Sequence, residues 1–405
     1  MIDLESARSR VLDGCVALPA VRVLLAEACG LVLAEVVEAD QLLPPFANTA
    51  VDGYAVGSAD VAGASEALPA RLAVVETLAA GAASSRVLGA GEAMRIMTGA
   101  PIPAGADAVV MVEDTNAAAH GEVVEIRRPV NPGDAVRPAG DDVCPGDRLF
   151  VPGDVLSPAH VGVLASLGRL DVLAHPRPRV GVISTGDELV EGPIPLQPGQ
   201  IRDSNRITLL ALVEEAGATG IDLGLVRDDE VSIRAAFVAA AARCDAIISS
   251  GGVSMGEFDF VKRVLDEVGR MNWMQVAIRP AKPLAFGTID GTPVFGLPGN
   301  PVSSMVSFEL FARPGLRRLG GRHDDELVRR PVTAVAGEPL RRSPDGKTHF
   351  VRVVAANVEG RYVVRSAGGQ GSHQLAVMAA ANALAVLPDG DGVAAGDEVA
   401  VLLLG

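Results

Sequence analysis

Between residues 177 and 322 the sequence repeats one alternation: a short apolar run, a turn containing Gly or Asp, and an amphipathic stretch with a helical period. Strands separated by helices of this length are typical of βαβ units, in which helices cover a mostly parallel sheet. Ligands of such sheets bind where the strands end, so we expect functional residues directly after each strand. The predicted strands are 179–184, 222–226, 246–249, 275–278 and 294–297, and the predicted helices are 206–215, 230–243, 258–268 and 302–316.

The segments on either side of this alternation have different patterns. Residues 3–45 and 143–170 carry apolar residues at three-to-four spacing, which predicts two helical stretches that pack together as one discontinuous domain. Between them, short β-like runs are separated by Gly and Pro turns, which indicates a small β-rich domain. Strand-like runs after residue 326 predict a small β-barrel or sandwich.

The charge balance argues against nucleic acid as a partner. The chain has 35 Lys and Arg residues against 50 Asp and Glu residues, a formal net charge of −15, and only 3% of its residues are aromatic. A nucleic-acid-binding protein needs a basic surface to attract phosphates. The acidic total raises the question of how such a chain could bind an anionic substrate.

Neither the apolar runs nor the cysteines indicate a membrane or zinc protein. No apolar run approaches the roughly 18 residues of a membrane span, and the start MIDLESARSR lacks the pattern of a signal peptide, so we predict a cytoplasmic protein. The four cysteines form no C-x-x-C pair, and the six histidines are scattered, which makes a zinc site improbable.

Four polar turns follow the predicted strands. Gly251 and Gly252 would let backbone N–H groups approach a ligand, and the helices that begin near 257 and after Asn300 would present their positive ends to an anion. Either loop alone could be ordinary turn and capping chemistry, but both on one sheet edge favour a nucleotide or phosphorylated ligand. The turns read STGDE at 184–188, RDD at 227–229, SSGGVSMGEFD at 249–259 and GLPGNPVSS at 296–304.

Charged residues in and near these turns suggest how the anion would be neutralised. Asp187, Glu188, Asp228 and Asp259 offer hard oxygen ligands, which suit Mg²⁺ bridging phosphate oxygens, although each alone could cap a helix or face solvent. The Pro-rich segment RPAKP at 279–283 supplies two cations for an anionic group; the alternative is a solvated loop.

Weaker signals come from outside the α/β segment. Asp52 and Thr98 lie in unusually polar stretches of the small β domain, and either could contact a ligand or belong to a turn. Arg352 and the segment GQGSH that contains Ser372 could bind an anion. His373 has no partner at a spacing that would indicate a catalytic base.

Taken together, the motifs resemble those of the molybdopterin molybdenumtransferase family, which includes MoeA and the C-terminal domain of gephyrin. The α/β motifs are also similar to those of molybdopterin adenylyltransferases (MogA) and CinA-type proteins, but VDGYAV and RIMTGAP belong to a β domain that MogA-like proteins lack. The matching segments, from residue 44 to residue 373, are PPFANTAVDGYAV, RIMTGAPIPAGADAVV, RPAGDDV, VGVISTGDELV, QIRDSN, ISSGGVSMGEFDF, RPAKP, GLPGNPVSS and GQGSH.

The resemblance implies a fold of four domains. The expected domains are a helical linker and dimerisation domain (1–45 and 143–176), a small β domain (46–142), a MogA-like three-layer α/β domain with a parallel-rich sheet (177–325) and a C-terminal β-barrel (326–405).

The resemblance also implies an activity. Family members insert molybdate into adenylylated molybdopterin with release of AMP, and they use a divalent cation such as Mg²⁺. They are typically homodimers whose active cleft combines the α/β domain of one subunit with the β domain of the other. An upstream adenylyltransferase and recipient molybdoenzymes are the expected protein partners. An adenylyltransferase and a non-catalytic scaffold are the alternative functions, and the sequence does not distinguish molybdate from tungstate.

The family motifs assign roles to particular residues of this chain. Asp141 remains an alternative to Asp142, and Arg279 stands where many relatives have Lys. The expected catalytic residues are Asp52, Thr98, Asp142, Glu188, Asp259 and Lys282, and the expected metal ligands are Asp187, Glu188, Asp228 and Asp259. The expected substrate-binding residues are Ser184, Thr185, Gly186, Ser250, Gly251, Gly252, Ser254, Arg279, Pro298, Gly299, Asn300, Pro301, Ser303, Arg352 and Ser372.

Overall fold

The computed structural model describes residues 1–116, 122–251 and 260–404. The chain forms two compact units. The larger unit comprises Met1–Ala34, Gly153–Ser157 and Asp171–Gly405, and the smaller unit comprises Glu35–Pro152 and Pro158–Leu170.

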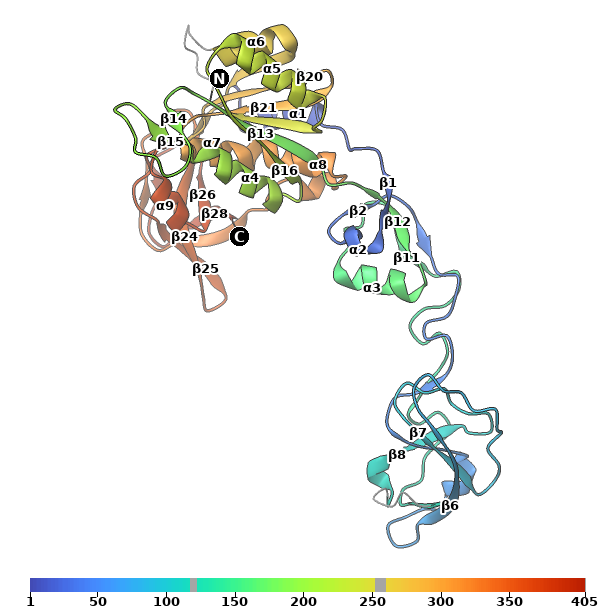
Figure 1. The fold of residues 1–405 in the computed structure, drawn as a ribbon. Helices are drawn as coiled ribbons and strands as arrows, with labels where there is room; N and C mark the ends of the chain where they lie inside the picture. Colours follow the sequence, from blue (N-terminus) through green and yellow to red (C-terminus); the bar gives the residue numbers. More distant parts are fainter. Residues whose placement is uncertain (117–121, 252–259, 405) are drawn as a thin grey trace. The chain divides into compact units, whose positions relative to one another are not determined.

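A six-stranded sheet forms the centre of the larger unit (Figure 1). The first four strands in spatial order are parallel, and the last two are antiparallel. Register pairs Ser184 with Ser250 and Ser250 with Leu297, so three parallel strands end at one edge. The strands are, in spatial order, β16 (Thr219–Val226), β13 (Arg179–Thr185), β17 (Ala246–Ser250), β21 (Thr292–Leu297), β20 (Pro283–Ile289) and β18 (Arg270–Gln275).

Helices cover both faces of this sheet. In Figure 1, α5 and α6 lie above the sheet, and α4, α7 and α8 lie below it. Neighbouring residues of a strand point to opposite faces, so β17 places Ile247 in the upper core and Ile248 in the lower core. This is why the parallel strands are continuously apolar. The helices are α1 (Leu4–Asp13), α4 (Asn205–Glu215), α5 (Glu230–Ala241), α6 (Phe260–Val268), α7 (Pro301–Ser307) and α8 (Arg313–Leu319), with a π-helical turn (Phe308–Ala312) between α7 and α8.

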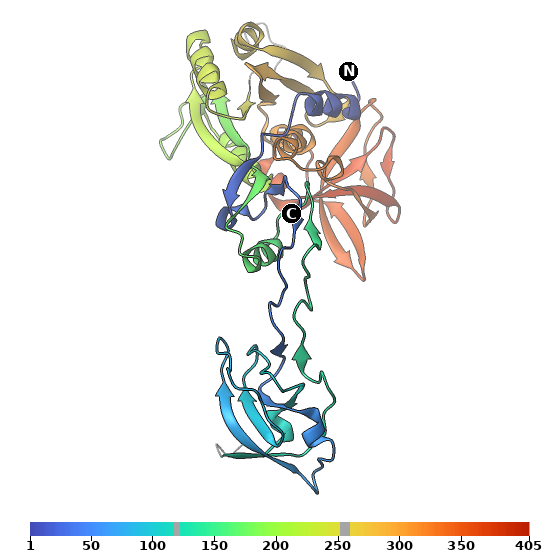
Figure 2. The same ribbon diagram turned by 90° about the vertical axis from the view of Figure 1, so that its right-hand side faces the viewer.

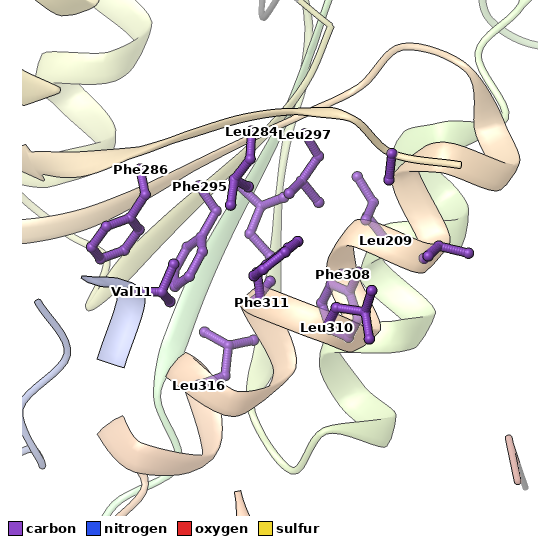
Figure 3. Packing of buried hydrophobic residues seen from close by; sticks show 14 of the residues in the cluster. Val11, Leu209, Leu284, Phe286, Phe295, Leu297, Phe308, Leu310, Phe311 and Leu316 are labelled. Atoms are coloured by element: carbon purple, nitrogen blue, oxygen red, sulfur yellow. The ribbon is translucent and has the colours of Figure 1, made fainter. Parts of the chain in front are cut away.

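The lower core contains the densest aromatic packing of the sheet (Figure 3). The rings of Phe286 and Phe295 lie 5.1 Å apart between their centroids. Phe308 and Phe311, both in the π-helical turn, are fully buried against the same cluster. The helix predicted over 302–316 is therefore interrupted rather than continuous.

The prediction of a strand at 275–278 is wrong. Strand β18 ends at Gln275, and a separate strand, β19 (Ile278–Arg279), pairs in parallel with residues 348–349 of the C-terminal region. The antiparallel strands β18 and β20 were missed because β18 lies at the sheet edge and half of its residues are polar, and because β20 opens with Pro283, which the first position of a strand tolerates.

The N-terminal part of the larger unit also differs from the prediction. The helical interpretation of residues 21–29 is wrong, because β1 (Val21–Leu24) pairs with β12 (Asp171–His175) and only the short helix α2 (Leu25–Ala28) follows. Strand β2 (Val32–Leu33) pairs with the other edge of β12. Pairing with a strand distant in sequence has overridden the local helical spacing.

The C-terminal strands close into a small barrel. The strand order is β24-β25-β22-β28-β26, and an additional pairing of β24 with β26 closes it. Its interior is filled by small and branched side chains such as Val353, Ala385 and Val401. The strands are β22 (Val332–Ala336), β24 (Thr348–Val358), β25 (Arg361–Ser366), β26 (Ala383–Leu387) and β28 (Glu398–Leu403); the pair β23 (Leu340–Arg341) and β27 (Gly392–Val393) and helix α9 (Leu375–Ala380) accompany them.

A five-stranded sheet of order β8-β5-β7-β6-β9 dominates the smaller unit (Figure 2). Separate apolar clusters cover its two faces, one around Tyr54 and Val110 and the other around Ala55 and Val109. The strands are β5 (Gly53–Val56), β6 (Ala70–Leu78), β7 (Glu92–Ile96), β8 (Ala108–Met111) and β9 (Val123–Ile126); the pairs β4 (Asn48–Thr49) with β10 (Val136–Arg137) and β3 (Val37–Glu38) with β11 (Arg148–Phe150), and helix α3 (Pro158–Ser166), complete the unit.

None of the helices in the described parts of the chain is both long and apolar enough to cross a membrane.

Candidate substrate site

One side-chain amide joins two of the predicted ligand loops. Asn205, the first residue of α4, donates from Nδ2 to the hydroxyl of Ser250 at 2.7 Å and to the carbonyl oxygen of Gly299 at 2.7 Å. Ser250 is the last residue of β17, and Gly299 follows the end of β21. The two loops therefore lie beside each other at the carboxyl edge of the sheet.

Gly251 is required for this close approach. Its φ of 94° lies in the left-handed region, which L side chains rarely adopt. A Cβ there would lie 3.2 Å from the carbonyl oxygen of Thr185, and its backbone N–H donates to the carbonyl of Leu297 at 3.1 Å. Gly251 thus contacts the ends of both neighbouring strands. The rest of the predicted glycine loop, including Gly252 and Ser254, lies outside the described residues.

The ion pair between Asp203 and Arg206 supports the same carboxyl edge of the sheet. These two residues were not among the predicted site residues. The side chain of Asp203 is 1% exposed; it accepts from the Ser184 hydroxyl at 3.1 Å and from Nε of Arg206 at 3.1 Å. Arg206 also pairs with the carboxylates of Asp222 and Glu191. The polar run QIRDSN, which opens α4, is the signal that could have indicated these residues.

The same arginine affects the ionisation of Asp222. Burial raises the pKa of this carboxyl, but the hydrogen bonds from Arg206 and from the backbone of Gly224 outweigh burial and hold the pKa below its usual value. Asp222 therefore stays ionised and keeps Arg206 paired.

Three of the four predicted magnesium ligands lie on two adjacent turns. Asp187 Oδ1 accepts from the backbone N–H of Asp228 at 3.3 Å, and both Asp187 and Glu188 are exposed. Asp259 lies outside the described residues. In the described ranges, no cluster of three or more His, Cys, Asp or Glu residues forms a complete cation site. The exposed carboxylates of Asp187 and Glu188 are hard oxygen donors of the kind that Mg²⁺ prefers.

A pocket of about 470 Å³ lies between the sheet and the barrel, within the larger unit. Arg279, Lys282 and Lys347 line it, and none of its described lining residues is Asp or Glu. Such a pocket suits a compact anion. The structure thus brings together six predicted site residues at this pocket. They are the predicted catalytic residue Lys282 and the predicted substrate-binding residues Arg279, Pro298, Asn300, Ser303 and Ser372.

Backbone hydrogen bonds hold the cationic segment 279–283 at both ends. Arg279 lies in β19, whose partner residues are Thr348 and His349 of the barrel. The carbonyl oxygen of Lys282 accepts from the N–H of Val276 at 2.8 Å. The segment is therefore anchored, and the alternative of a solvated loop does not describe it.

Lys347 is a pocket residue that the sequence analysis missed. Its Nζ donates to Asp345 at 2.7 Å, and Asp345 also accepts from Arg342 at 2.9 Å and contacts His349 at 3.1 Å. The hydrogen bond from Lys347, followed by that from His349, lowers the pKa of Asp345 to about 2. The side chain of Arg342 is 1% exposed and also binds Asp389, so it organises the turn that presents Lys347.

Arg352, which the sequence analysis assigned to substrate, occupies a different position. It is fully buried and is not among the described residues that line the pocket. Its Nη2 donates to the carbonyl of Gly369 at 2.8 Å, and its backbone exchanges hydrogen bonds with the side-chain amide of Gln370. Burial lowers the pKa of Arg352. Arg352 thus supports the loop that carries Ser372.

In the smaller unit, two of the predicted catalytic residues are hydrogen-bonded to each other. Asp52 Oδ1 accepts from the backbone N–H and the hydroxyl of Thr98, both at 2.7 Å. The backbone bond, followed by the hydroxyl bond, lowers the pKa of Asp52. Asp141 and Asp142 are both exposed, and the N–H of Asp142 donates to the carbonyl of Leu43.

The remaining predicted residues lie next to these contacts. Thr185 ends β13 and Gly186 follows it, and Pro301 opens α7 directly after Asn300.

These features define a multidomain α/β protein with a cationic pocket beside the carboxyl edge of its main sheet. Sequence models match three consecutive parts of the chain: the MoeA N-terminal region (domains I and II) at residues 2–168, a probable molybdopterin-binding domain at 181–318, and the MoeA C-terminal region (domain IV) at 333–404. The chain belongs to the MoeA family and is a transferase of molybdenum cofactor biosynthesis.

Curated relatives match over nearly the whole chain. Molybdopterin molybdenumtransferase 2 of Mycobacterium tuberculosis is 40% identical over 384 residues, 93% of each chain. The molybdopterin molybdenumtransferase of Haemophilus influenzae is 38% identical and covers 99% of this chain and 98% of its own. The solved structure of the MoeA protein of Pyrococcus horikoshii has a TM-score of 0.79 at 30% identity, with both chains fully covered. The predicted fold class is confirmed.

Proposed function

We propose that this chain is a molybdopterin molybdenumtransferase: it inserts molybdate into adenylylated molybdopterin and releases AMP. The observation that carries the proposal is the position of residues 298–300. The carbonyl oxygen of Gly299 accepts the hydrogen bond from Asn205 at the sheet edge. The neighbouring residues Pro298 and Asn300 line the cationic pocket. A substrate with a nucleotide at one end and a molybdate-accepting pterin at the other needs two adjacent sites of this kind.

The two sites divide the substrate between them. The sheet edge, with Ser250, Gly251 and Gly299, receives the nucleotide and its phosphates. The pocket receives molybdate and the pterin phosphate through Arg279, Lys282 and Lys347, because none of its described lining residues is a carboxylate. Lys347 is also paired with Asp345, which is not a lining residue. Molybdate binds the dithiolene sulfurs of the pterin, so no cysteine ligand is needed from the protein.

Magnesium is the proposed cofactor. Asp187, Glu188 and Asp228 would hold it, together with Asp259 from outside the described residues. When bound, Mg²⁺ neutralises charge on the phosphate oxygens as AMP departs.

A homodimer is the proposed working form. In it, the Asp52–Thr98 pair of one subunit closes the cleft of the other, and Asp142 contributes from the same β domain. The segments VDGYAV and RIMTGAP support this assignment through their likeness to the family. A molybdopterin adenylyltransferase would supply the substrate, and recipient molybdoenzymes would accept the cofactor.

The test is a reconstitution assay. Purified chain, adenylylated molybdopterin, Mg²⁺ and molybdate are incubated with an apo-molybdoenzyme, and AMP release and recovered enzyme activity are measured. The proposal expects both to depend on molybdate, and parallel reactions with tungstate define the anion preference. Pyrophosphate production from ATP and molybdopterin would instead identify an adenylyltransferase. Binding of the substrate without turnover would identify a scaffold.

A further inference from the structure

The polarity of the hydrogen bonds at the sheet edge distinguishes Ser184, the second-last residue of β13, from Ser250, the last residue of β17. We infer that Asn205 is a positioning residue that orients the Ser250 hydroxyl to donate its hydrogen to a substrate phosphate oxygen. This inference rests on the proposed function and assigns a role to a residue that does not itself need to contact substrate.

The direction of the bond from Asn205 is fixed by its second partner. Both contacts come from Nδ2, and the partner at Gly299 is a carbonyl oxygen, which can only accept. The nitrogen therefore points at both partners, and its two hydrogens are both used. Ser250 is consequently the acceptor of the bond that it shares with Asn205.

A hydroxyl that accepts still has its own hydrogen to donate. Ser250 Oγ has no acceptor among the described residues, although Ser250 is only 4% exposed. Its hydrogen is therefore available at the position where β17 ends and the glycine loop begins. Donation to an anionic phosphate oxygen gives a charge-assisted bond, which is stronger than one to a neutral group.

The neighbouring serine shows the opposite polarity. Ser184 Oγ donates to the buried carboxylate of Asp203 at 3.1 Å, so its hydrogen is already used within the protein. Of these two serine hydroxyls, only that of Ser250 keeps its hydrogen free to donate among the described residues.

The second bond of Asn205 makes the orientation rigid. Gly299 is fixed by the same amide, and a Cβ at Gly299 would lie only 3.8 Å from Cα of Gly251. Loss of the amide would free both the hydroxyl rotor and the loop after β21. Asn205 is therefore expected to act on phosphate binding, and the cationic pocket should retain its own affinity for molybdate.

Calorimetric titration with AMP in the presence of Mg²⁺ tests the inference. Asn205→Ala and Ser250→Ala are each expected to weaken AMP binding by about tenfold, the effect of losing one charge-assisted hydrogen bond. The double variant should bind little more weakly than either single variant, because both changes remove the same interaction. Asn205→Asp should bind AMP more weakly than Asn205→Ala, since its carboxylate accepts the Ser250 hydrogen and repels phosphate.

The matched control is Asn382→Ala. Asn382 also uses its side-chain amide in two hydrogen bonds, both to the backbone of Ala355 in the barrel. This variant should lower the melting temperature but leave AMP affinity unchanged. In turnover assays, Asn205→Ala should raise KM for adenylylated molybdopterin and leave KM for molybdate unchanged.

Three results separate the possible failures. Unchanged AMP affinity in Asn205→Ala, or additive losses in the double variant, would overturn the role of Asn205 while the proposed function stands. Failure of the unaltered protein to bind either AMP or adenylylated molybdopterin would overturn the proposed function and this inference with it.

Discussion

The carbonyl oxygen of Ser372 accepts a hydrogen bond of 3.0 Å from the backbone N–H of Val302. This bond joins a loop of the C-terminal barrel to the first turn of α7, beside the cationic pocket. Ser372 is therefore positioned by its backbone, while the residue itself lines the pocket.

Lys282→Met should impair molybdate binding most directly. Loss of one charge-assisted contact is expected to raise the molybdate concentration for half-maximal AMP release by roughly tenfold or more. The matched control is Lys262→Met, which removes an exposed lysine on α6 that stacks over Trp273. An equal change in both variants would contradict a local role for Lys282.

Asp345→Asn should alter the dependence of stability on pH. The pKa of Asp345 is lowered to about 2 in the folded chain, from its ordinary value of 3.8. The stabilisation is therefore present above pH 4 and is lost as the pH falls toward 2. Urea unfolding of the unaltered protein and the variant should give free energies that differ above pH 4 and converge below it. A constant difference across this range would show that Asp345 acts by packing alone.

Arg352→Ala should destabilise the fold by about 2–4 kcal/mol, because it removes a buried side chain and its bond to Gly369. Arg352→Met should cost less, since Nε and Nη1 of Arg352 have no hydrogen-bond partner among the described residues and methionine fills much of the space. Denaturant unfolding measures both values. A loss in Arg352→Met as large as that in Arg352→Ala would mean that side-chain volume does not account for the stabilisation by Arg352.

Glu188→Gln should raise the Mg²⁺ concentration needed for half-maximal AMP release several-fold, because a neutral amide is a poorer ligand for a hard cation. Glu267→Gln, which changes a half-exposed carboxylate paired with Arg234 on α5, is the control. Identical magnesium dependence in Glu188→Gln and the unaltered protein would remove Glu188 from the proposed metal site.

A shared cleft predicts complementation between inactive subunits. Asp52→Asn and Lys282→Met each damage a different component of the same site. When the two variants are mixed and refolded together, mixed dimers would hold one intact site each, so about a quarter of the unaltered activity should return. No recovery in mixtures that are shown to contain mixed dimers would place both residues in a site within one subunit.

The sequence predicted best those strands that are buried on both faces of the sheet. Strands β13, β17 and β21 are apolar on both faces, so their runs stand out and their carboxyl ends could be placed correctly. Strand β18 lies at the edge and half of its residues are polar, and β1 pairs with β12, which is distant in sequence, so neither strand has a clear local signal. Pairing between distant segments decides such elements.

The site residues likewise divide into those with a local sequence signal and those positioned by contacts between distant segments. Polar turns after strands indicated Ser250 and Lys282, because the topology of an α/β sheet fixes where those turns lie. Lys347 was missed and Arg352 was assigned to substrate because both lie on β24 or the turn before it, and only barrel closure determines which one faces the pocket. Asn205 was missed because its partners are 45 and 94 residues away in sequence.

Strand β19 connects the cationic segment 279–283 to both the α/β domain and the barrel. It follows from the α/β sheet in the chain, yet it hydrogen-bonds along β24 as an outer strand of the barrel sheet. An α/β domain cut free at residue 325 would keep the sheet edge with Ser250 and Gly299 but would lose Lys347, Ser372 and the strand that pairs with Arg279. The cationic pocket therefore exists only where the α/β domain and the barrel are joined in one chain.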